Sequence, residues 1–282
     1  SKQALALLGN DSDTEVIIFT SKPLDSDIAI NLIHFINTLN KPVVVNFLGF
    51  APIVDQIGNV FFAKTLREAV ELSVELCGTK THSTVAHSIE IQEFAETQRY
   101  ARGLFSGGTL AYETLLVLNT FTEGVYSNIA IDPEYKLDDL NVSKENTVID
   151  MGEDTFTLGR LHPMMDYDLR LRRLRQEAED SGTAVILLDM VLGYGSHPNP
   201  SEELAPVIAE IKASAASEGR FLEVVVLVVG TEEDPQDFTS QIDLLSQSGA
   251  HIETCADQAA SYVGNIILAL NSDSNNIVSS TS

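Results

Sequence analysis

The stretch Arg102-Gly-Leu-Phe-Ser-Gly-Gly-Thr-Leu-Ala-Tyr-Glu-Thr-Leu-Leu-Val-Leu118 decides the fold of the longer part of this sequence. Its apolar run 103–105 predicts a strand, and the leucines after Thr109 recur at helical spacing. The turn Ser106-Gly-Gly-Thr109 would direct backbone N–H groups and the positive end of a helix dipole towards one point. A tight turn with Ser106 or Thr109 as helix N-cap would have the same sequence. The stretch therefore predicts a strand–turn–helix unit, with or without a bound anion.

Four further apolar runs of strand length follow this unit and alternate with helical patterns. The predicted strands are 147–150, 184–189, 222–229 and 251–253, with an additional run at 125–130. The predicted helices are 167–180, which carries a basic face, 201–217, one ending at Gln247, and 257–270. Five main strands in this order predict a flavodoxin-like parallel sheet in which strand 1 lies beside strand 3. We expect this domain to span 102–270, and the Ser- and Asn-rich tail 271–282 to be disordered.

Residues 1–78 predict a smaller parallel α/β domain of the same kind. The predicted strands are 15–20, 43–47 and 59–63, and the predicted helices are 1–8, 25–39 and 66–76. Thr65 is in the N-cap position of the last helix, with Glu68 in the capping-box position. Three strands leave a sheet edge open, so we expect this domain to be incomplete at its N-terminus. The order of its elements repeats that of the later part of 102–270, which suggests a duplication.

A polar stretch, 79–101, predicts a linker between the two domains. It holds His82 and His87, but their spacing and the lack of a nearby cysteine do not favour a metal site. The two cysteines of the chain, Cys77 and Cys255, form no disulfide framework and are typical of a reducing compartment.

Composition excludes several classes of partner. The 282 residues carry a net charge of −24, which disfavours binding to nucleic acid or to an anionic membrane surface. No apolar run has the length of a membrane span, so we expect a soluble, cytoplasmic protein. Any anionic ligand would have to be held locally, by helix ends and a few arginines.

Ligands of flavodoxin-like domains bind at the carboxyl ends of the strands near the switch point, which here selects the loops 106–109, 153–166 and 189–198. Three residues in them are candidates for catalysis: His162 for proton transfer, Arg160 for holding an anion, and Asp189. The candidate phosphate- or anion-binding residues are Ser106, Gly107, Gly108, Thr109, Gly193 and Gly195. We expect no metal site, because no spacing signature supports one.

Each candidate has a structural alternative. Arg160 could pair with Asp154 or Glu153 on the surface, His162 could cap a turn, and Asp189 could cap the turn that follows its strand. A triad of Ser106, His162 and Asp189 is disfavoured, because no G-x-S-x-G elbow surrounds the serine. The chain also has no G-x-x-x-x-G-K-[ST] motif for a nucleoside triphosphate.

Longer stretches resemble two related families. The run Gly103-Leu-Phe-Ser-Gly-Gly-Thr-Leu-Ala-Tyr-Glu113 resembles the start of the ligase domain in succinyl-CoA synthetase α subunits. The FdrA family is more similar, through Val148-Ile-Asp-Met-Gly-Glu-Asp-Thr-Phe-Thr-Leu-Gly-Arg-Leu-His-Pro-Met-Met-Asp166, Val185-Ile-Leu-Leu-Asp-Met-Val-Leu-Gly-Tyr-Gly-Ser-His197 and Val229-Gly-Thr-Glu-Glu-Asp-Pro-Gln236. The resemblance implies two flavodoxin-like domains of the CoA-ligase type, 1–78 and 102–270.

The resemblance also exposes a departure. Succinyl-CoA synthetases carry a phosphorylated histidine in a Gly-His-Ala-Gly loop after the fourth strand, whereas 229–237 holds no histidine here. The FdrA resemblance implies instead a subunit of an oxamate carbamoyltransferase in allantoin (purine) catabolism. Phosphate or carbamoyl phosphate would then be a substrate, and no firm cofactor is implied.

Three functions therefore remain open. The first is the carbamoyl-transferring enzyme subunit. The second is an acyl-CoA synthetase subunit similar to succinyl-CoA ligase, which would use CoA. The third is a non-catalytic scaffold subunit. In each case we expect a small anionic ligand or substrate, and either a homodimer or other subunits of a hetero-complex as partners.

Overall fold

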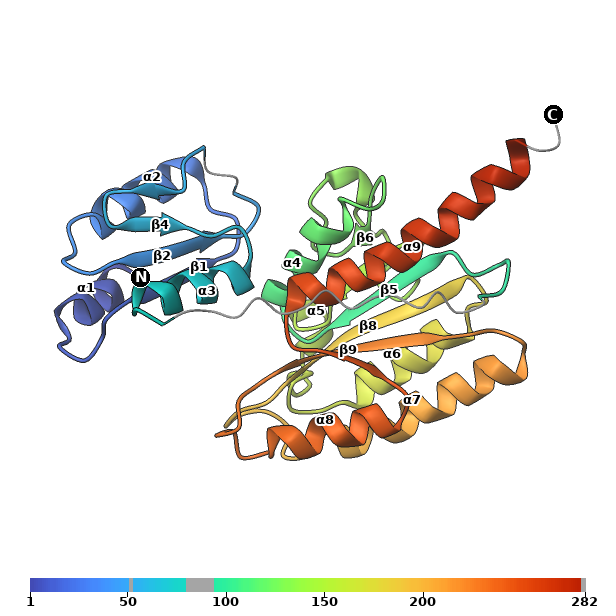
Figure 1. Ribbon diagram of the computed structural model, residues 1–282. Helices are drawn as coiled ribbons and strands as arrows, with labels where there is room; N and C mark the ends of the chain where they lie inside the picture. Colours follow the sequence, from blue (N-terminus) through green and yellow to red (C-terminus); the bar gives the residue numbers. More distant parts are fainter. Residues whose placement is uncertain (51–52, 80–93, 280–282) are drawn as a thin grey trace. The chain divides into compact units, whose positions relative to one another are not determined.

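Parallel strands form the centre of each of the two units into which the chain divides, Ser1–His87 and Ser88–Ser282. The computed structural model describes residues 1–50, 53–79 and 94–279 (Figure 1). The predicted fold class, α/β with two parallel-sheet domains, is confirmed. Most of the predicted linker, including His82 and His87, lies outside the described residues.

The first unit holds a four-stranded sheet in the order β1-β2-β4-β3. Its helices are α1 (Lys2–Asn10), α2 (Ser26–Ile36) and α3 (Leu66–Leu76), and its strands are β1 (Ile17–Ser21), β2 (Val43–Phe47), β3 (Gln56–Ile57) and β4 (Val60–Phe62). Strand β3 was not predicted; it pairs antiparallel with β4 across a turn at Gly58, which has a positive φ of 62°. The predicted cap is confirmed, since Thr65 Oγ1 accepts from the Glu68 N–H at 3.1 Å.

The second unit holds a six-stranded parallel sheet. Its strands are β5 (Tyr100–Phe105), β6 (Tyr126–Ser127), β7 (Thr147–Asp150), β8 (Thr183–Val191), β9 (Glu223–Val229) and β10 (His251–Glu253). Its helices are α4 (Gly108–Leu118), the 3₁₀ turn η1 (Pro133–Tyr135), α5 (Asp154–Thr157), α6 (Asp168–Glu179), α7 (Pro200–Ser217), α8 (Phe238–Gln247) and α9 (Ala256–Ser279). The strand order is β10-β9-β8-β5-β7-β6, so β5 lies beside β8 as predicted.

Helices cover both faces of this sheet (Figure 1). Helices α6, α7 and α8 pack on one face around Ile149, Ile186 and Val226. Helices α4 and α9 pack on the other around Phe105, Val185 and Val225. Because both faces are buried, the strands are continuous apolar runs, and this is why they could be recognised in the sequence.

One predicted strand of this unit is wrong in extent. The run 125–130 forms only the short strand β6, because the Asn128 side chain bonds both the N–H and the carbonyl of Asp150 and ends the ladder. Helix α9 extends as far as Ser279. The disorder expected for 271–282 stays a prediction.

Strands β1, β2 and β4 of the first unit have the same parallel order as β8, β9 and β10 of the second. In both units a helix follows each of the first and third strands of this set. The topology is therefore compatible with the suggested duplication.

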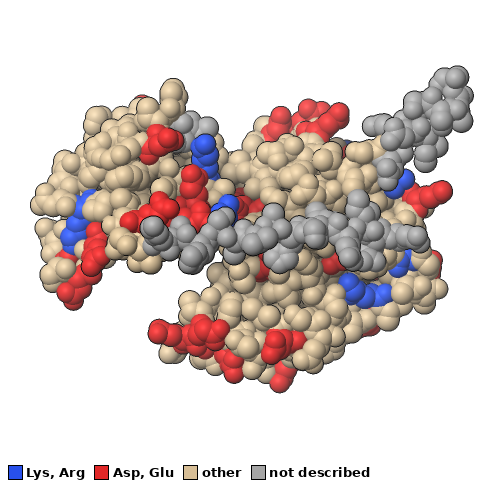
Figure 2. All heavy atoms as spheres, viewed as in Figure 1, with Lys and Arg blue, Asp and Glu red and all other residues tan. Residues whose placement is uncertain are grey.

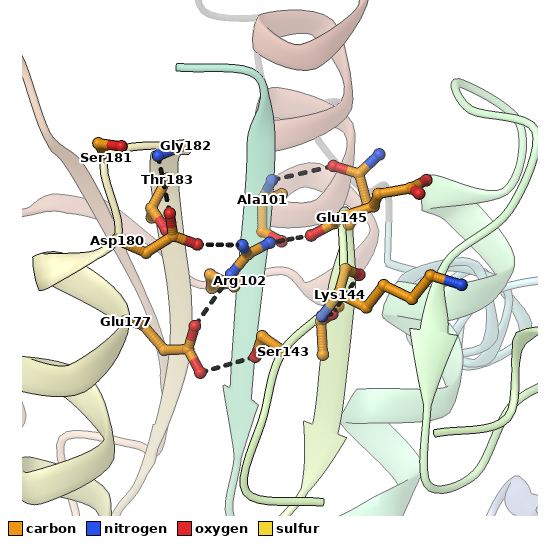
Figure 3. Close-up of polar contacts among 12 residues, drawn as sticks. Ala101, Arg102, Ser143, Lys144, Glu145, Glu177, Asp180, Ser181, Gly182 and Thr183 are labelled. Atoms are coloured by element: carbon orange, nitrogen blue, oxygen red, sulfur yellow. Dashed lines mark hydrogen bonds and ion pairs between the residues drawn. The ribbon is translucent and has the colours of Figure 1, made fainter. Parts of the chain in front are cut away.

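A buried network of ion pairs joins α6 to β5 near the amino-terminal ends of the strands (Figure 3). Arg102 donates through Nε to Glu177 at 2.9 Å and through Nη2 to Asp180 at 2.7 Å. Its Nη1 donates to the carbonyls of Ala101 and Glu145. Every nitrogen of this guanidinium therefore has an acceptor, as a buried arginine with a purely structural role requires.

Substituting Glu177→Leu should lower the free energy of unfolding of the second unit by about 3 kcal/mol, because it leaves two buried arginines, Arg102 and Arg173, without this partner. Glu179→Leu, on the exposed side of the same helix, is the matched control and should change it by less than about 0.5 kcal/mol. Native-state hydrogen exchange of the β5 and α6 amides measures the difference; equal effects of the two substitutions would contradict the structural role of the network.

Candidate functional site

The face shown in Figure 2 carries more acidic than basic side chains, as the net charge of −24 requires. Four arginines, Arg102, Arg170, Arg173 and Arg220, are buried and leave the surface still poorer in positive charge. Within the described residues, no helix is long and apolar enough to cross a membrane. An anionic ligand would thus be bound by local donors rather than by a basic surface.

The three loops selected from the sequence meet at the carboxyl ends of β5, β7 and β8. A methyl group on Gly152 would lie 2.4 Å from the Ser106 carbonyl oxygen and 3.0 Å from His162 Nε2. One on Gly107 would lie 3.2 Å from Met164 Cε. The N–H of His197 donates to the Met164 carbonyl at 2.8 Å. The first loop therefore contacts the second, and the second contacts the third.

Asp189 is the buried centre of this arrangement. It is fully buried at the carboxyl end of β8, and its oxygens accept from the Ser106 N–H at 2.8 Å and the Ser106 hydroxyl at 2.7 Å. Arg170 of α6 donates to the same carboxylate at 2.8 Å. The Arg170 Nη2 group also donates to the carbonyls of Leu104 and Asp189. This carboxylate thus ties together the ends of β5 and β8 and the first turn of α6.

These contacts change the roles predicted for two residues. Both donors of Ser106 are engaged by Asp189, so in this conformation they are not available to a phosphate. Asp189 does not cap the turn that follows its own strand; it accepts from a neighbouring strand end instead. The geometry gives both residues a positioning role at the start of α4.

The first turn of α4 presents unpaired backbone donors. Gly107 is the N-cap residue, and no side chain caps this helix end. In the part of the chain that the structure describes, the N–H groups of Gly107, Gly108 and Thr109 have no hydrogen-bond acceptor. Four N–H groups at a helix start need partners from side chains, water or ligands, and the helix dipole favours an anion there. Of the predicted anion-binding residues, these three keep the geometry for that role.

His162 lies at the edge of the same region and is half-buried. Its Nδ1 accepts from the Met164 N–H at 3.3 Å, which confirms the turn-capping alternative. In the neutral form the ring proton is therefore on Nε2. Nε2 is also the atom that approaches Gly152, next to the Ser106 carbonyl and Asp150. His162 can thus act as a proton donor on the side where the loops meet.

Tyr167 and Arg170 form a buried pair beneath the loops. The guanidinium carbon of Arg170 lies 5.0 Å from the centre of the Tyr167 ring. The Tyr167 and His197 rings are 5.6 Å apart between centroids and meet edge to face. Burial raises the pKa of Tyr167 to about 12, so the phenol stays neutral at physiological pH. The charge of Arg170 and its side-chain interaction with the Tyr167 hydroxyl lower the pKa of Tyr167 and so oppose part of the effect of burial.

Arg160 does not join this cluster through any contact that the structure records. It is exposed and lines a hollow of about 280 Å³ together with Leu161, Asp166 and Arg172. In the described ranges its guanidinium makes no ion pair, so pairing with Asp154 or Glu153 is wrong. Glu153 instead accepts from Asn128 at 2.8 Å.

Gly193 and Gly195 line a second hollow of about 320 Å³, with Tyr194 and Gln236. Gly193 has a φ of +130°, a conformation that favours glycine. Its N–H donates to Gln236 Oε1 at 3.0 Å, and the Gly195 N–H donates to the Gly193 carbonyl at 3.2 Å. Both amides are therefore engaged, and the prediction that they hold an anion does not agree with this geometry.

The triad considered from the sequence is not formed. Ser106 Oγ bonds Asp189 directly, with no bond from His162 to the serine hydroxyl, so the three residues do not form a triad. Across residues 1–50, 53–79 and 94–279, no group of three His, Cys, Asp or Glu side chains could hold a metal ion.

Sequence reasoning missed the inward-facing arginines of α6. The helix was interpreted as basic-faced, but two of its four arginines, Arg170 and Arg173, are buried. Arg175 is half-buried, and Arg172 is exposed. The buried positions 170, 173, 174, 177 and 178 recur at helical spacing, so the pattern was present. The charges of these residues hid the pattern, because arginines are rarely buried unless they are paired. Asp189, the partner of Arg170, lies 19 residues away, whereas Glu177 follows Arg173 by only four residues and could have been noticed.

The second unit also matches a known family. The family model described as CoA-ligase matches residues 104–266, more than half of the chain. The uncharacterized protein YahF of Escherichia coli (strain K12) is 39% identical over 255 residues, which cover 87% of this chain and 49% of YahF. The chain thus spans about half the length of this curated relative.

Two solved structures of a dinucleotide-forming acetyl-coenzyme A synthetase 1 from Ca. Korarchaeum cryptofilum are more distant. The complex with phosphate and ADP has a TM-score of 0.42 at 12% identity, and the apo form has 0.43 at 14%. Each covers 100% of this chain and 58% of the synthetase chain. Structures at this distance carry no argument about function. The family model covers the end of β5, α4 and the site loops, and this chain therefore belongs to the CoA-ligase family.

Proposed function

We propose that the second unit binds the phosphoryl group of an acyl phosphate, or free phosphate, as part of an acid–thiol ligase that forms acyl-CoA. The observation that carries the proposal is the uncapped first turn of α4, with three adjacent N–H groups free of acceptors in the described chain. A helix end of this kind binds phosphate through its amides and its dipole. Membership of the CoA-ligase family supports the choice of reaction.

In the proposed reaction, a thiol of CoA attacks the acyl carbon of the acyl phosphate. The carbon–sulfur bond forms, the bond from carbon to the phosphate oxygen breaks, and the thiol proton is released to water. The α4 amides would stabilise the charge of the departing phosphate. His162, with its proton on Nε2, would donate a hydrogen bond or proton to that leaving group. We assign no residue of this chain to binding the part of CoA beyond its thiol.

The family match favours this reaction over carbamoyl transfer, the function inferred first from the resemblance to the FdrA family. The comparisons give carbamoyl transfer no support, and the FdrA resemblance itself stays a prediction. The loop between β9 and α8 has no histidine, so the proposal includes no phosphohistidine in this loop. Because the chain covers 49% of YahF, the activity of the whole protein and its other subunits also remain part of the proposal.

The α4 turn can be tested by removing one N–H without removing the helix. Gly108 is the first residue of α4, a position that tolerates proline, and Gly107 before it is extended (φ −150°, ψ 138°), as a residue preceding proline should be. Gly108→Pro should weaken binding of inorganic phosphate about tenfold or more, the loss expected for one hydrogen bond to a charged group.

Gly108→Ala is the control, because it adds a side-chain carbon and keeps the N–H. Isothermal titration of the full chain with phosphate measures both variants. Unchanged binding by Gly108→Pro would place the anion elsewhere, and equal losses in both variants would assign the effect to crowding rather than to the lost donor.

The proposed reaction predicts that the protein forms acetyl-CoA from acetyl phosphate and CoA, and that His162→Gln lowers kcat by about 100-fold. The phosphate Kd should change little, because His162 acts on the leaving group and not as a main anion ligand. Thioester absorbance measures turnover. His34→Gln, at an exposed position of α2, is the matched control. Consumption of carbamoyl phosphate without CoA, in place of thioester formation, would favour carbamoyl transfer instead.

A further inference from the structure

A buried carboxylate lies next to the proposed anion site. Asp189 accepts from the backbone N–H of Ser106, the residue directly before the Gly107 N-cap of α4. An ionised carboxylate in this position would repel a phosphate at the α4 amides, and low local dielectric would strengthen the repulsion. The charge of Asp189 must therefore be balanced before an anion can bind beside it.

Arg170 is the group that can supply this balance. Its Nη2 lies 2.8 Å from Asp189 Oδ1, and both side chains are almost completely removed from solvent. The same nitrogen donates to the Leu104 carbonyl, so the guanidinium lies against the end of β5 as well. The pair is neutral in sum, which leaves the dipole of α4 free to act on an external anion.

Arg102 differs from Arg170 in the carboxylates that it bonds. Each nitrogen of Arg102 has an acceptor, as Figure 3 shows. Arg170 is equally buried, but Asp189 is the one carboxylate that it bonds among the described residues. Arg102 bonds two carboxylates, Glu177 and Asp180. Arg170 and Asp189 therefore form a one-to-one pair without net charge next to the start of α4.

We propose that Arg170 is a positioning residue for phosphate-type anions. It acts through Asp189, by cancelling the charge of the carboxylate that holds Ser106 and the start of α4. The inference rests on the proposed anion site and deepens it, since it names the group that lets a net-acidic protein bind phosphate there.

The experiment is a charge cycle with three variants of the full chain, each titrated with inorganic phosphate by calorimetry. Arg170→Met leaves the Asp189 charge unbalanced and should weaken phosphate binding about tenfold. Asp189→Asn leaves the Arg170 charge unbalanced, keeps one oxygen for the Ser106 N–H, and should tighten binding. The double variant restores a neutral pair and should bind within about threefold of the wild type.

The sign of the Asp189→Asn effect decides between the two roles. If Arg170 and Asp189 act only by holding the loops in place, both single variants weaken binding and the double variant does not recover it; that result would overturn the inference and leave the anion site intact. If Arg170→Met does not fold, the Asp189→Asn variant alone still gives the sign.

Hydrogen exchange of the Ser106 amide, measured without ligand, tests whether Asp189→Asn keeps the α4 turn in place. Retained protection with tighter phosphate binding supports charge balance. Retained protection with unchanged or weaker binding contradicts it. Absence of saturable phosphate binding by the wild type would overturn the proposed anion site itself, and this inference with it.

Discussion

The second unit depends on one buried interaction, the hydrogen bonds that the Asp189 carboxylate accepts from Ser106 and Arg170. They join the ends of the two central strands, β5 and β8, to the first turn of α6. A carboxylate in a fully buried position is stable only if it is paired and hydrogen-bonded, and here three donors meet it. The direction in which α4 leaves the sheet is fixed at the same point, since Ser106 directly precedes its N-cap.

This constraint explains why a serine that resembles a phosphate ligand in sequence faces the protein instead. The Ser106 donors point inwards to Asp189, and the N–H groups of the next three residues are left for a ligand. The Ser106 side chain thus positions the turn, and the backbone N–H groups that follow it would bind the anion.

Much of this fold could be predicted because both faces of its sheets are buried. The apolar runs of β8 and β9 are unmistakable, and their alternation with helices leads to the order in which β5 lies beside β8. The convergence of the three loops followed from that order. Short elements were harder: β3 has only two residues, and Asn128 ended β6 through a side-chain bond that no periodicity reveals.

The details of the site could not be predicted, because they depend on pairs that are distant in sequence. The Arg170–Asp189 pair spans 19 residues, and the bonds between Gln236 and Gly193 span 43. Gln236 takes the amide that the glycine pattern of the third loop had suggested for an anion. Spacing can place residues at one sheet edge, but only the packed structure decides which donors remain free.

Amide NMR of the full chain, recorded during titration with inorganic phosphate, tests most sharply whether an anion binds at the free amides of α4. We expect saturable shifts of the Gly107, Gly108 and Thr109 amides, with the Gly193 and Gly195 amides unaffected. Unchanged α4 amides, or shifts confined to the residues around Arg160, would contradict it.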